Sequence, residues 1–151
     1  MKFYSYIENN DDKKINIYVD MDGVLAEYDI GNFDYGTIRP LYSNIKRIEE
    51  LVKKDNINLE LLSICKNNKV VEEKKIWLKK YMPFFDVNKA NLISKEEYEG
   101  IPSRELKSNY LKENTDKEEI NILVDDDPDI IKCVVKNNDD VKVFHVSSWI
   151  D

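Results

Sequence analysis

The sequence lacks the features that anchor a chain in a membrane or cross-link it outside the cell. Its only two cysteines, Cys65 and Cys133, have no paired spacing, which is typical of free thiols in a reducing compartment. No apolar run approaches the ~20 residues of a membrane helix, and the first residues lack the apolar core of a signal peptide. We therefore expect a cytoplasmic protein that does not bind a membrane.

Basic residues are also fewer than acidic ones. The sequence has 23 lysines and arginines and 30 aspartates and glutamates, which gives a net charge of -7. A nucleic-acid binder needs a basic stripe against the phosphates, so we expect no nucleic-acid binding. A small phosphorylated substrate stays compatible with this charge, because a bound divalent cation can reverse the local field. The only histidine, His145, lies in a strand pattern, where packing is a simpler role than catalysis.

The chain is long enough for one hydrophobic core. Of its 151 residues, 42% are hydrophobic and 35% are charged, as in soluble globular proteins. No internal repeat or low-complexity segment divides it. We expect a single domain over residues 1–151.

Apolar runs alternate with helical patterns along most of this length. Strands are predicted at residues 15–19, 59–64, 87–93, 120–124 and 141–146. Helices are predicted at residues 44–54, 70–81, 103–112 and 129–135, with Ser103 as an N-cap. Residues 1–14 are predicted to form an edge strand or a loose tail. This alternation indicates an α/β fold with a mostly parallel sheet covered by helices on both faces.

Two of the predicted strands end in acidic residues. Asp20 and Asp22 follow the first strand and directly precede Gly23. If the first and fourth strands are neighbours, both acidic groups lie at the carboxyl edge of the sheet, where open α/β folds bind ligands. The acidic run after the fourth strand consists of Asp125, Asp126, Asp127 and Asp129.

Some of these carboxylates have a simpler explanation than a ligand. Asp127 and Asp129 lie where a helix is predicted to begin, so both are accounted for as helix-capping acids. Asp20 differs, because a carboxylate at the end of a buried strand is costly without a partner. Carboxylates gathered at one edge repel one another, and Mg²⁺ is a cation that prefers such oxygen ligands. The pattern therefore predicts a Mg²⁺ site.

A hydroxyl and a lysine ammonium are further candidates for the same edge. Ser63 lies at the end of the second predicted strand. Lys107 lies on the helix before the acidic strand, and Lys74 lies on the helix after Ser63. Each of these signals is weak alone, since serine often ends strands and most lysines are solvated surface charges.

Four signals follow one another along the chain: the first acidic pair, Ser63, a lysine, and the acids after the fourth strand. Together they resemble the four motifs of the haloacid dehalogenase (HAD) superfamily, in the same order. The sequence is most similar to the 5′(3′)-deoxyribonucleotidase-like members, including small phage-type proteins, over about residues 15–146. This resemblance implies a three-layer, Rossmann-like HAD core and a Mg²⁺-dependent phosphomonoesterase, with 5′-nucleotides among its candidate substrates. The shared segments are Asp20-Met21-Asp22-Gly23-Val24-Leu25-Ala26, Leu62-Ser63, Glu73-Lys74 with Trp77-Leu78, and Leu123-Val124-Asp125-Asp126.

The resemblance also implies catalytic roles for the first two aspartates. Asp20 would be the nucleophile that accepts the phosphoryl group, and Asp22 would be the general acid and base. Mg²⁺ would be held by Asp20, by the backbone carbonyl of Asp22 and by Asp125. Asp126 would complete the metal site directly or through water, and Asp129 is the alternative outer partner.

The phosphoryl oxygens would be held by a second group of residues. The resemblance implies Ser63, Lys107 and the backbone amides around Met21–Gly23 for this role. Lys107 is the first choice because residues 105–110 resemble the lysine-tyrosine segment of phage-type members. Lys74 is a strong alternative, and Lys117 is a weaker one.

The segment between the first motif and the next helix is short. Capped members carry a helical module here that selects the substrate, whereas residues 27–43 suffice only for a flap. We therefore expect a minimal cap or none. The aromatic residues of this segment would either form a lid over a substrate ring or cover the edge of the core; they are Tyr28, Phe33, Tyr35 and Tyr42.

Two other functions remain open from the sequence. A receiver-like regulatory domain also combines acids, Mg²⁺ and a phosphorylated aspartate, but receivers carry paired acids after the first strand and the phosphoacceptor after the third. A catalytically idle module that keeps the phosphate and metal site is the other alternative.

Overall fold

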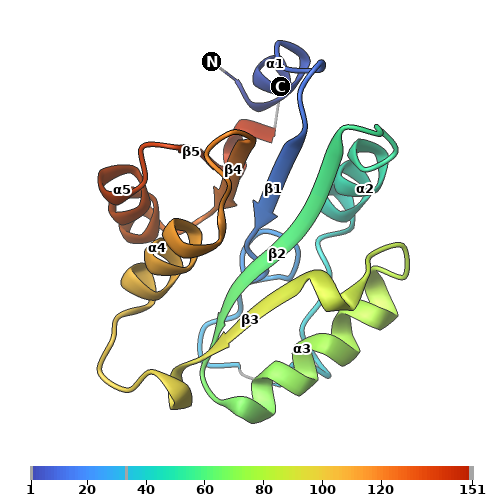
Figure 1. Cartoon of the computed structure of the whole chain (residues 1–151). Coiled ribbons are helices and arrows are strands. Elements are labelled where there is room, and N and C mark those ends of the chain that lie inside the picture. Colours follow the sequence, from blue (N-terminus) through green and yellow to red (C-terminus); the bar gives the residue numbers. More distant parts are fainter. Residues whose placement is uncertain (1, 33, 150–151) are drawn as a thin grey trace.

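The computed structural model describes residues 2–32 and 34–149 and contains a five-stranded, wholly parallel sheet in the order β3-β2-β1-β4-β5 (Figure 1). The strands are β1 (Ile15–Val19), β2 (Ile57–Cys65), β3 (Ala90–Ser94), β4 (Ile120–Asp125) and β5 (Val141–His145). The α-helices are α1 (Phe3–Glu8), α2 (Tyr42–Leu51), α3 (Asn68–Tyr81), α4 (Ser103–Asn114) and α5 (Pro128–Asn137). Three short 3₁₀ turns are η1 (Val87–Lys89), η2 (Lys95–Glu97) and η3 (Val146–Trp149).

β1 is the central strand, and all five of its residues are buried. It pairs with β2 and β4 in parallel register, with Val19 opposite both Leu61 and Val124. The condition stated from the sequence, that the two strands ending in acids are neighbours, is therefore met. Because the three strands end at the same edge, the residues that follow them are brought together there.

Helices cover both faces of the sheet, with α2 and α3 on one side and α4 and α5 on the other (Figure 1). Side chains alternate accordingly along β1. Ile17 and Val19 belong to the larger core cluster, whereas Tyr18 packs with Leu123 and Val134 under α4 and α5. The predicted three-layer, Rossmann-like α/β fold is confirmed.

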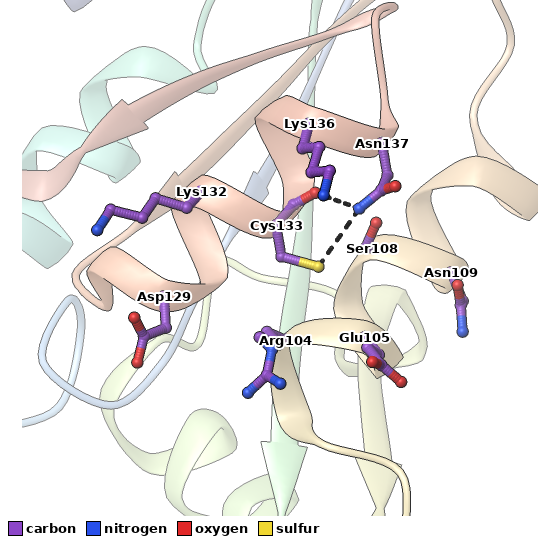
Figure 2. Close-up of a pocket in the computed structure, with 9 residues that line it drawn as sticks. All are labelled: Arg104, Glu105, Ser108, Asn109, Asp129, Lys132, Cys133, Lys136 and Asn137. Atoms are coloured by element: carbon purple, nitrogen blue, oxygen red, sulfur yellow. Dashed lines mark hydrogen bonds between the residues drawn. The ribbon is translucent and has the colours of Figure 1, made fainter.

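A polar groove lies over the outer layer between α4 and α5 (Figure 2). Its volume is about 610 Å³, and it is lined by residues such as Arg104, Asp129 and Lys132. Within it, the Asn137 amide donates to the carbonyl oxygen of Cys133 at 2.8 Å. The groove lies over the helices, and the residues lining it include none of those brought together at the ends of β1 and β2.

The first residues differ from the prediction, because they form helix α1 and neither an edge strand nor a loose tail. Phe3 and Ile7 are one helical turn apart and are both buried. Phe3 packs edge-on against Phe144 at a centroid distance of 5.5 Å and lies 5.7 Å from Trp149. Burial of this stripe against the end of the chain favours a helix.

Other boundaries shift by a few residues. The third strand begins only at Ala90, since residues 87–89 form the turn η1. Ser103 is the first residue of α4, and its N-cap is Pro102, so the predicted capping role of Ser103 is wrong. None of the helices in the described part of the chain is long and apolar enough to cross a membrane.

Between β1 and α2, the described residues form turns and isolated bridges, with no helix and no regular strand. The amide of Glu27 donates to the carbonyl of Arg39 at 2.8 Å, which closes the segment into a loop. Within the loop, Asp34 accepts hydrogen bonds from the amides of Gly36 and Thr37 through its side-chain and backbone oxygens respectively. We call this segment the flap; that it takes the place of a larger cap stays a prediction.

Candidate active site

A tight turn follows β1 and sets the positions of the first two acids. The amide of Asp20 continues the ladder by donating to the carbonyl of Val124 at 3.0 Å. The carbonyl of Met21 then accepts from the amides of Leu25 and Ala26, both at 2.9 Å. Gly23 has a φ of 78° in this turn, a conformation that favours glycine.

The space at position 23 also favours glycine. A Cβ atom there would lie 2.0 Å from the Oδ2 atom of Asp126. The carboxylate of Asp126 therefore lies where the Cβ atom of any other residue at position 23 would be, so the turn after β1 is in direct contact with the acidic run after β4. The amide of Gly23 donates to the carbonyl of Ala26 at 2.8 Å, so this amide is already used within the turn.

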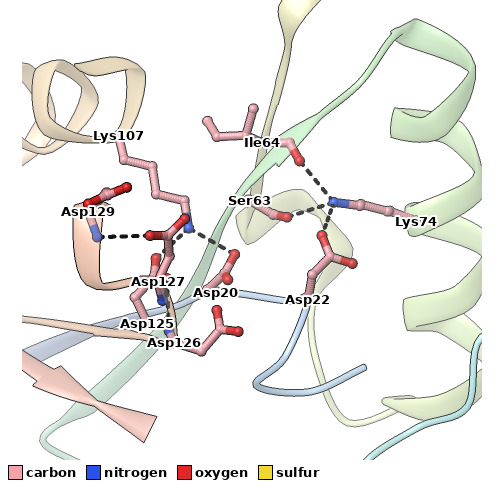
Figure 3. Close-up of polar contacts among 10 residues, drawn as sticks. All are labelled: Asp20, Asp22, Ser63, Ile64, Lys74, Lys107, Asp125, Asp126, Asp127 and Asp129. Carbon is pink, nitrogen blue, oxygen red and sulfur yellow. Dashed lines mark hydrogen bonds and ion pairs between the residues drawn. The ribbon is translucent and has the colours of Figure 1, made fainter. Parts of the chain in front are cut away.

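Lys107 reaches into the site from α4 and joins the two acidic strands (Figure 3). Its ammonium lies 2.8 Å from Oδ1 of Asp20 and 2.6 Å from Oδ2 of Asp125. The residue is 1% exposed. Burial alone would lower the pKa of this ammonium, but the two carboxylates raise it more, so its pKa lies above the usual value.

Asp20, Asp125 and Asp126 form a compact acidic cluster. One oxygen from each lies within 4.8 Å of the others. Oδ1 of Asp125 accepts from the backbone amides of Asp126 and Asp127 at 2.8 and 3.0 Å, which fixes the orientation of this carboxylate. Burial and the neighbouring charges of Asp20 and Asp125 raise the pKa of Asp126 to about 7, and burial and Asp20 also raise that of Asp125.

This cluster suits a hard divalent cation. Two of the three carboxylates, Asp20 and Asp125, contact the ammonium of Lys107, and burial together with the neighbouring carboxylates raises the pKa of Asp125 and of Asp126. Mg²⁺ takes oxygen ligands and commonly binds one or two carboxylates with waters. Asp20, Asp125 and Asp126 are the residues that could hold it. The predicted contribution of the Asp22 carbonyl stays a prediction.

A second ammonium, that of Lys74 on α3, organises the other half of the site (Figure 3). It lies 2.9 Å from Oδ2 of Asp22 and 2.8 Å from Oγ of Ser63, and it also donates to the carbonyl of Ile64 at 3.1 Å. Lys74 is 1% exposed and Ser63 is fully buried. Sequence reasoning treated Lys74 and Lys107 as rivals for one position, whereas the site contains both.

The two lysines separate the acids into two groups. Asp20 contacts Lys107, and the carboxylate of Asp22 contacts Lys74 and lies outside the acidic cluster. Figure 3 shows the side chains of Asp20 and Asp22 between these ammonium groups. The arrangement can therefore place a nucleophilic carboxylate and a separate proton-carrying carboxylate at one edge of the sheet.

The remaining candidates lie elsewhere. Asp127 is the N-cap of α5, and its side chain accepts from the amide of Asp129 at 2.8 Å, as the capping interpretation predicts. The carboxylate of Asp129 lines the groove of Figure 2 and is not part of the acidic cluster. Lys117 is on the surface, 3.8 Å from Asp140.

The aromatic residues of the flap do not form one lid. Tyr28 is exposed and Tyr35 is buried, and both line a small cavity beside Asp22. Tyr42 is exposed at the start of α2 and packs edge-on against Tyr81. Phe33 lies outside the described residues.

Comparison with known proteins shows what the fold resembles. The sequence matches no protein-family model and no curated protein. The structure resembles a chain of the Pnkp1/Rnl/Hen1 complex, with a TM-score of 0.67 and 17% identity over 88% of this chain and 46% of the other. A chain of the Pnkp1/Rnl/Hen1 RNA repair complex gives a TM-score of 0.66 and 16% identity over 89% of this chain and 42% of the other.

A third solved structure is the N-terminal part of BF1531 from Bacteroides fragilis, which contains a phosphatase domain and is complexed with Mg. Its TM-score is 0.57 with 15% identity, over 87% of this chain and 35% of the other. The likeness is one of fold. The chain spans less than half the length of each of these three solved chains.

The raised pKa of Asp126 predicts a stability that depends on pH and metal. Its folded pKa of about 7 exceeds the ~3.9 of an unfolded aspartate, so the stabilisation from its neutral form is complete below about pH 4 and lost through about pH 7. The melting temperature of the metal-free protein should therefore fall between pH 5 and 8, by a few °C. Mg²⁺ should raise it more at pH 8 than at pH 6.

Calorimetry of wild type and Asp126→Asn, each with EDTA and with Mg²⁺, measures this effect. The variant should show a flatter pH profile and a smaller gain from Mg²⁺. Asp127→Asn, which changes a neighbouring acid outside the cluster, is the control and should keep the wild-type slope. Equal slopes in wild type and Asp126→Asn would contradict the assignment.

Proposed function

We propose that the protein is a Mg²⁺-dependent phosphomonoesterase of the HAD type that works through an aspartyl-phosphate on Asp20. The observation that carries the proposal is the contact of Asp20 with a buried lysine, within an acidic cluster at the carboxyl edge of a parallel sheet. The shared fold with the phosphatase-containing part of BF1531, which is complexed with Mg, supports it. The substrates that we propose include nucleoside monophosphates.

In the first step, a carboxylate oxygen of Asp20 attacks phosphorus, and the bond from phosphorus to the ester oxygen breaks. Asp22 gives its proton to that oxygen, so that the leaving group departs as a neutral alcohol. The separate contacts of Asp20 with Lys107 and of Asp22 with Lys74 suit these different roles.

In the second step, water attacks the phosphorus of the aspartyl-phosphate. The carboxylate of Asp22 takes a proton from this water, and the bond between phosphorus and the Asp20 oxygen breaks. Inorganic phosphate and the free Asp20 carboxylate result, and Asp22 is again protonated. One residue thus serves as acid and then as base.

Charge stabilisation is the main task of the other residues. The equatorial oxygens of the transferring group carry spread negative charge, which fixed donors stabilise. Lys107, Lys74 and the hydroxyl of Ser63 are such donors at this edge. Mg²⁺, when bound, would supply further positive charge against the phosphoryl oxygens and the carboxylate cluster.

Hydrolysis of p-nitrophenyl phosphate tests the proposal. We expect Mg²⁺-dependent turnover that EDTA abolishes and added Mg²⁺ restores. A stable phosphorylated aspartate without turnover would favour the receiver-like alternative. Binding of Mg²⁺ or phosphate without any reaction would favour the idle module.

A further inference from the structure

A groove, which we call the edge groove, lies along β3, the strand at one end of the sheet (Figure 1). Its volume is about 550 Å³. Leu92 packs against the larger core cluster, and its neighbour Ile93 packs against the cluster under α4 and α5. Both line the edge groove, together with Val71 of α3 and Tyr110 of α4. Because neighbouring residues of a strand point to opposite faces, the edge groove reaches around the free side of β3.

β3 carries little that would keep another strand from pairing with it. Its residues, Ala90–Ser94, include no charge and no proline, and within the described chain its only strand neighbour is β2. The opposite edge strand, β5, instead presents the exposed residues Lys142 and His145. Natural sheets commonly protect an edge with charge, proline or a covering element. The backbone and the apolar side chains of β3 are therefore suited to pairing with an added strand.

Charged side chains lie at both ends of the edge groove. The only charged residues among the described ones that line it are Glu97 and Glu113, and both are exposed. Two exposed lysines, Lys89 and Lys95, directly flank β3. Glu97 follows the end of β3, whereas Glu113 lies toward its start, because α4 ends at Asn114, shortly before β4 begins at that edge of the sheet. Neither Lys95 nor Glu113 forms an ion pair within the described part of the chain.

We infer that the edge groove is a dimer interface, in which β3 pairs antiparallel with β3 of a second copy of this chain. A two-fold axis brings the same strand of both copies together in opposite directions, so the end of β3 in one copy meets its start in the other. Each end of this strand pair then holds Lys89 and Glu113 of one copy beside Lys95 and Glu97 of the other. The second copy thus supplies the positive charge that the acidic edge groove lacks, and opposite charges across a strand pair stabilise it.

Sedimentation velocity measures the oligomeric state. The wild type should form, at concentrations up to about 500 µM, a species with twice the 17.9 kDa of one chain. Lys95→Glu makes both ends of the strand pair negative, and Glu113→Lys makes both positive, whereas the wild-type ends are neutral over these four side chains. Each variant should therefore raise the dimer Kd about tenfold or more. Lys142→Glu is the matched control, because it makes the same charge change at an exposed position of the opposite edge, and it should leave the Kd within about twofold.

A mixture of the two single variants identifies the pairing. In a dimer with one copy of Lys95→Glu and one of Glu113→Lys, both ends are neutral again, so the mixture should regain a Kd near that of the wild type. The double variant Lys95→Glu/Glu113→Lys should do the same. Within one chain these positions lie toward opposite ends of β3, which spans five residues at ~3.3 Å each, so the rescue cannot arise inside a monomer.

Both positions are exposed, and thermal melts check that the variants are folded. A wild-type chain that stays monomeric up to about 500 µM overturns the inference, and the edge groove would then fit an extended segment of another protein. A dimer that neither single variant weakens also overturns it, because the copies would then meet at another surface. Two single variants that weaken the dimer but do not restore it when mixed would contradict the antiparallel pairing of β3.

Discussion

Replacing Asp20 with asparagine should lower phosphatase activity by about 10⁴-fold or more, because the change removes the proposed nucleophile. Asparagine has nearly the same shape, and its amide cannot form the acyl phosphate under these conditions. The fold should survive, since Lys107 keeps its contact with Asp125 at 2.6 Å. Single-turnover assays with p-nitrophenyl phosphate and a thermal melt measure the two effects.

The run of acids after β4 provides controls for this experiment. Asp129→Asn changes a carboxylate that lines the α4–α5 groove, so it should keep nearly full activity. Asp125→Asn should lose both activity and Mg²⁺ binding, because Asp125 belongs to the acidic cluster. An Asp20→Asn variant with more than about a tenth of wild-type activity would show that the nucleophile is another group.

The strands could be predicted well because their sequence signals are local and strong. The run Ile15–Val19 is apolar and is followed by charge, and the observed strand has the same bounds. The pairing of β1 with β4 was only a condition in the sequence analysis, because acids at two strand ends do not by themselves fix the strand order. The helix α1 could not be predicted, because its buried residue Phe3 packs against Phe144 and Trp149 from the far end of the chain.

The sequence predicted which residues belong to the site, but it did not predict which carboxylate each lysine contacts. Lys74 lies one helical turn from the buried residues Val70 and Leu78 and is itself buried, whereas the sequence pattern placed the lysines of this helix on its solvent side. Its partner was not readable, since nothing in the sequence shows which carboxylate an inward lysine meets. Sequence reasoning also left Tyr35 as one of several aromatics, because its unpaired hydroxyl is a property of the folded flap.

Replacing Lys107 with methionine should destabilise the metal-free protein by about 3–5 kcal/mol. Methionine fills a similar volume, but Asp20 and Asp125 then lie buried together without the ammonium that now contacts both. Mg²⁺ should restore part of this loss, because it neutralises the same carboxylates. Urea unfolding with EDTA and with Mg²⁺ measures both quantities, and Lys112→Met, at an exposed position of the same helix, should change stability little.

A double variant separates the electrostatic cause from loss of packing. If unpaired charge is the cause, Asp20→Asn should stabilise the Lys107→Met protein, because it removes one of the two buried carboxylates that repel each other. In the wild-type background, the same change should not stabilise the protein to that extent, since Asp20 there contacts Lys107 at 2.8 Å. Equal effects in both backgrounds would mean that Lys107 contributes to stability through its aliphatic stem alone, and the charge-pairing account of the site would then be wrong.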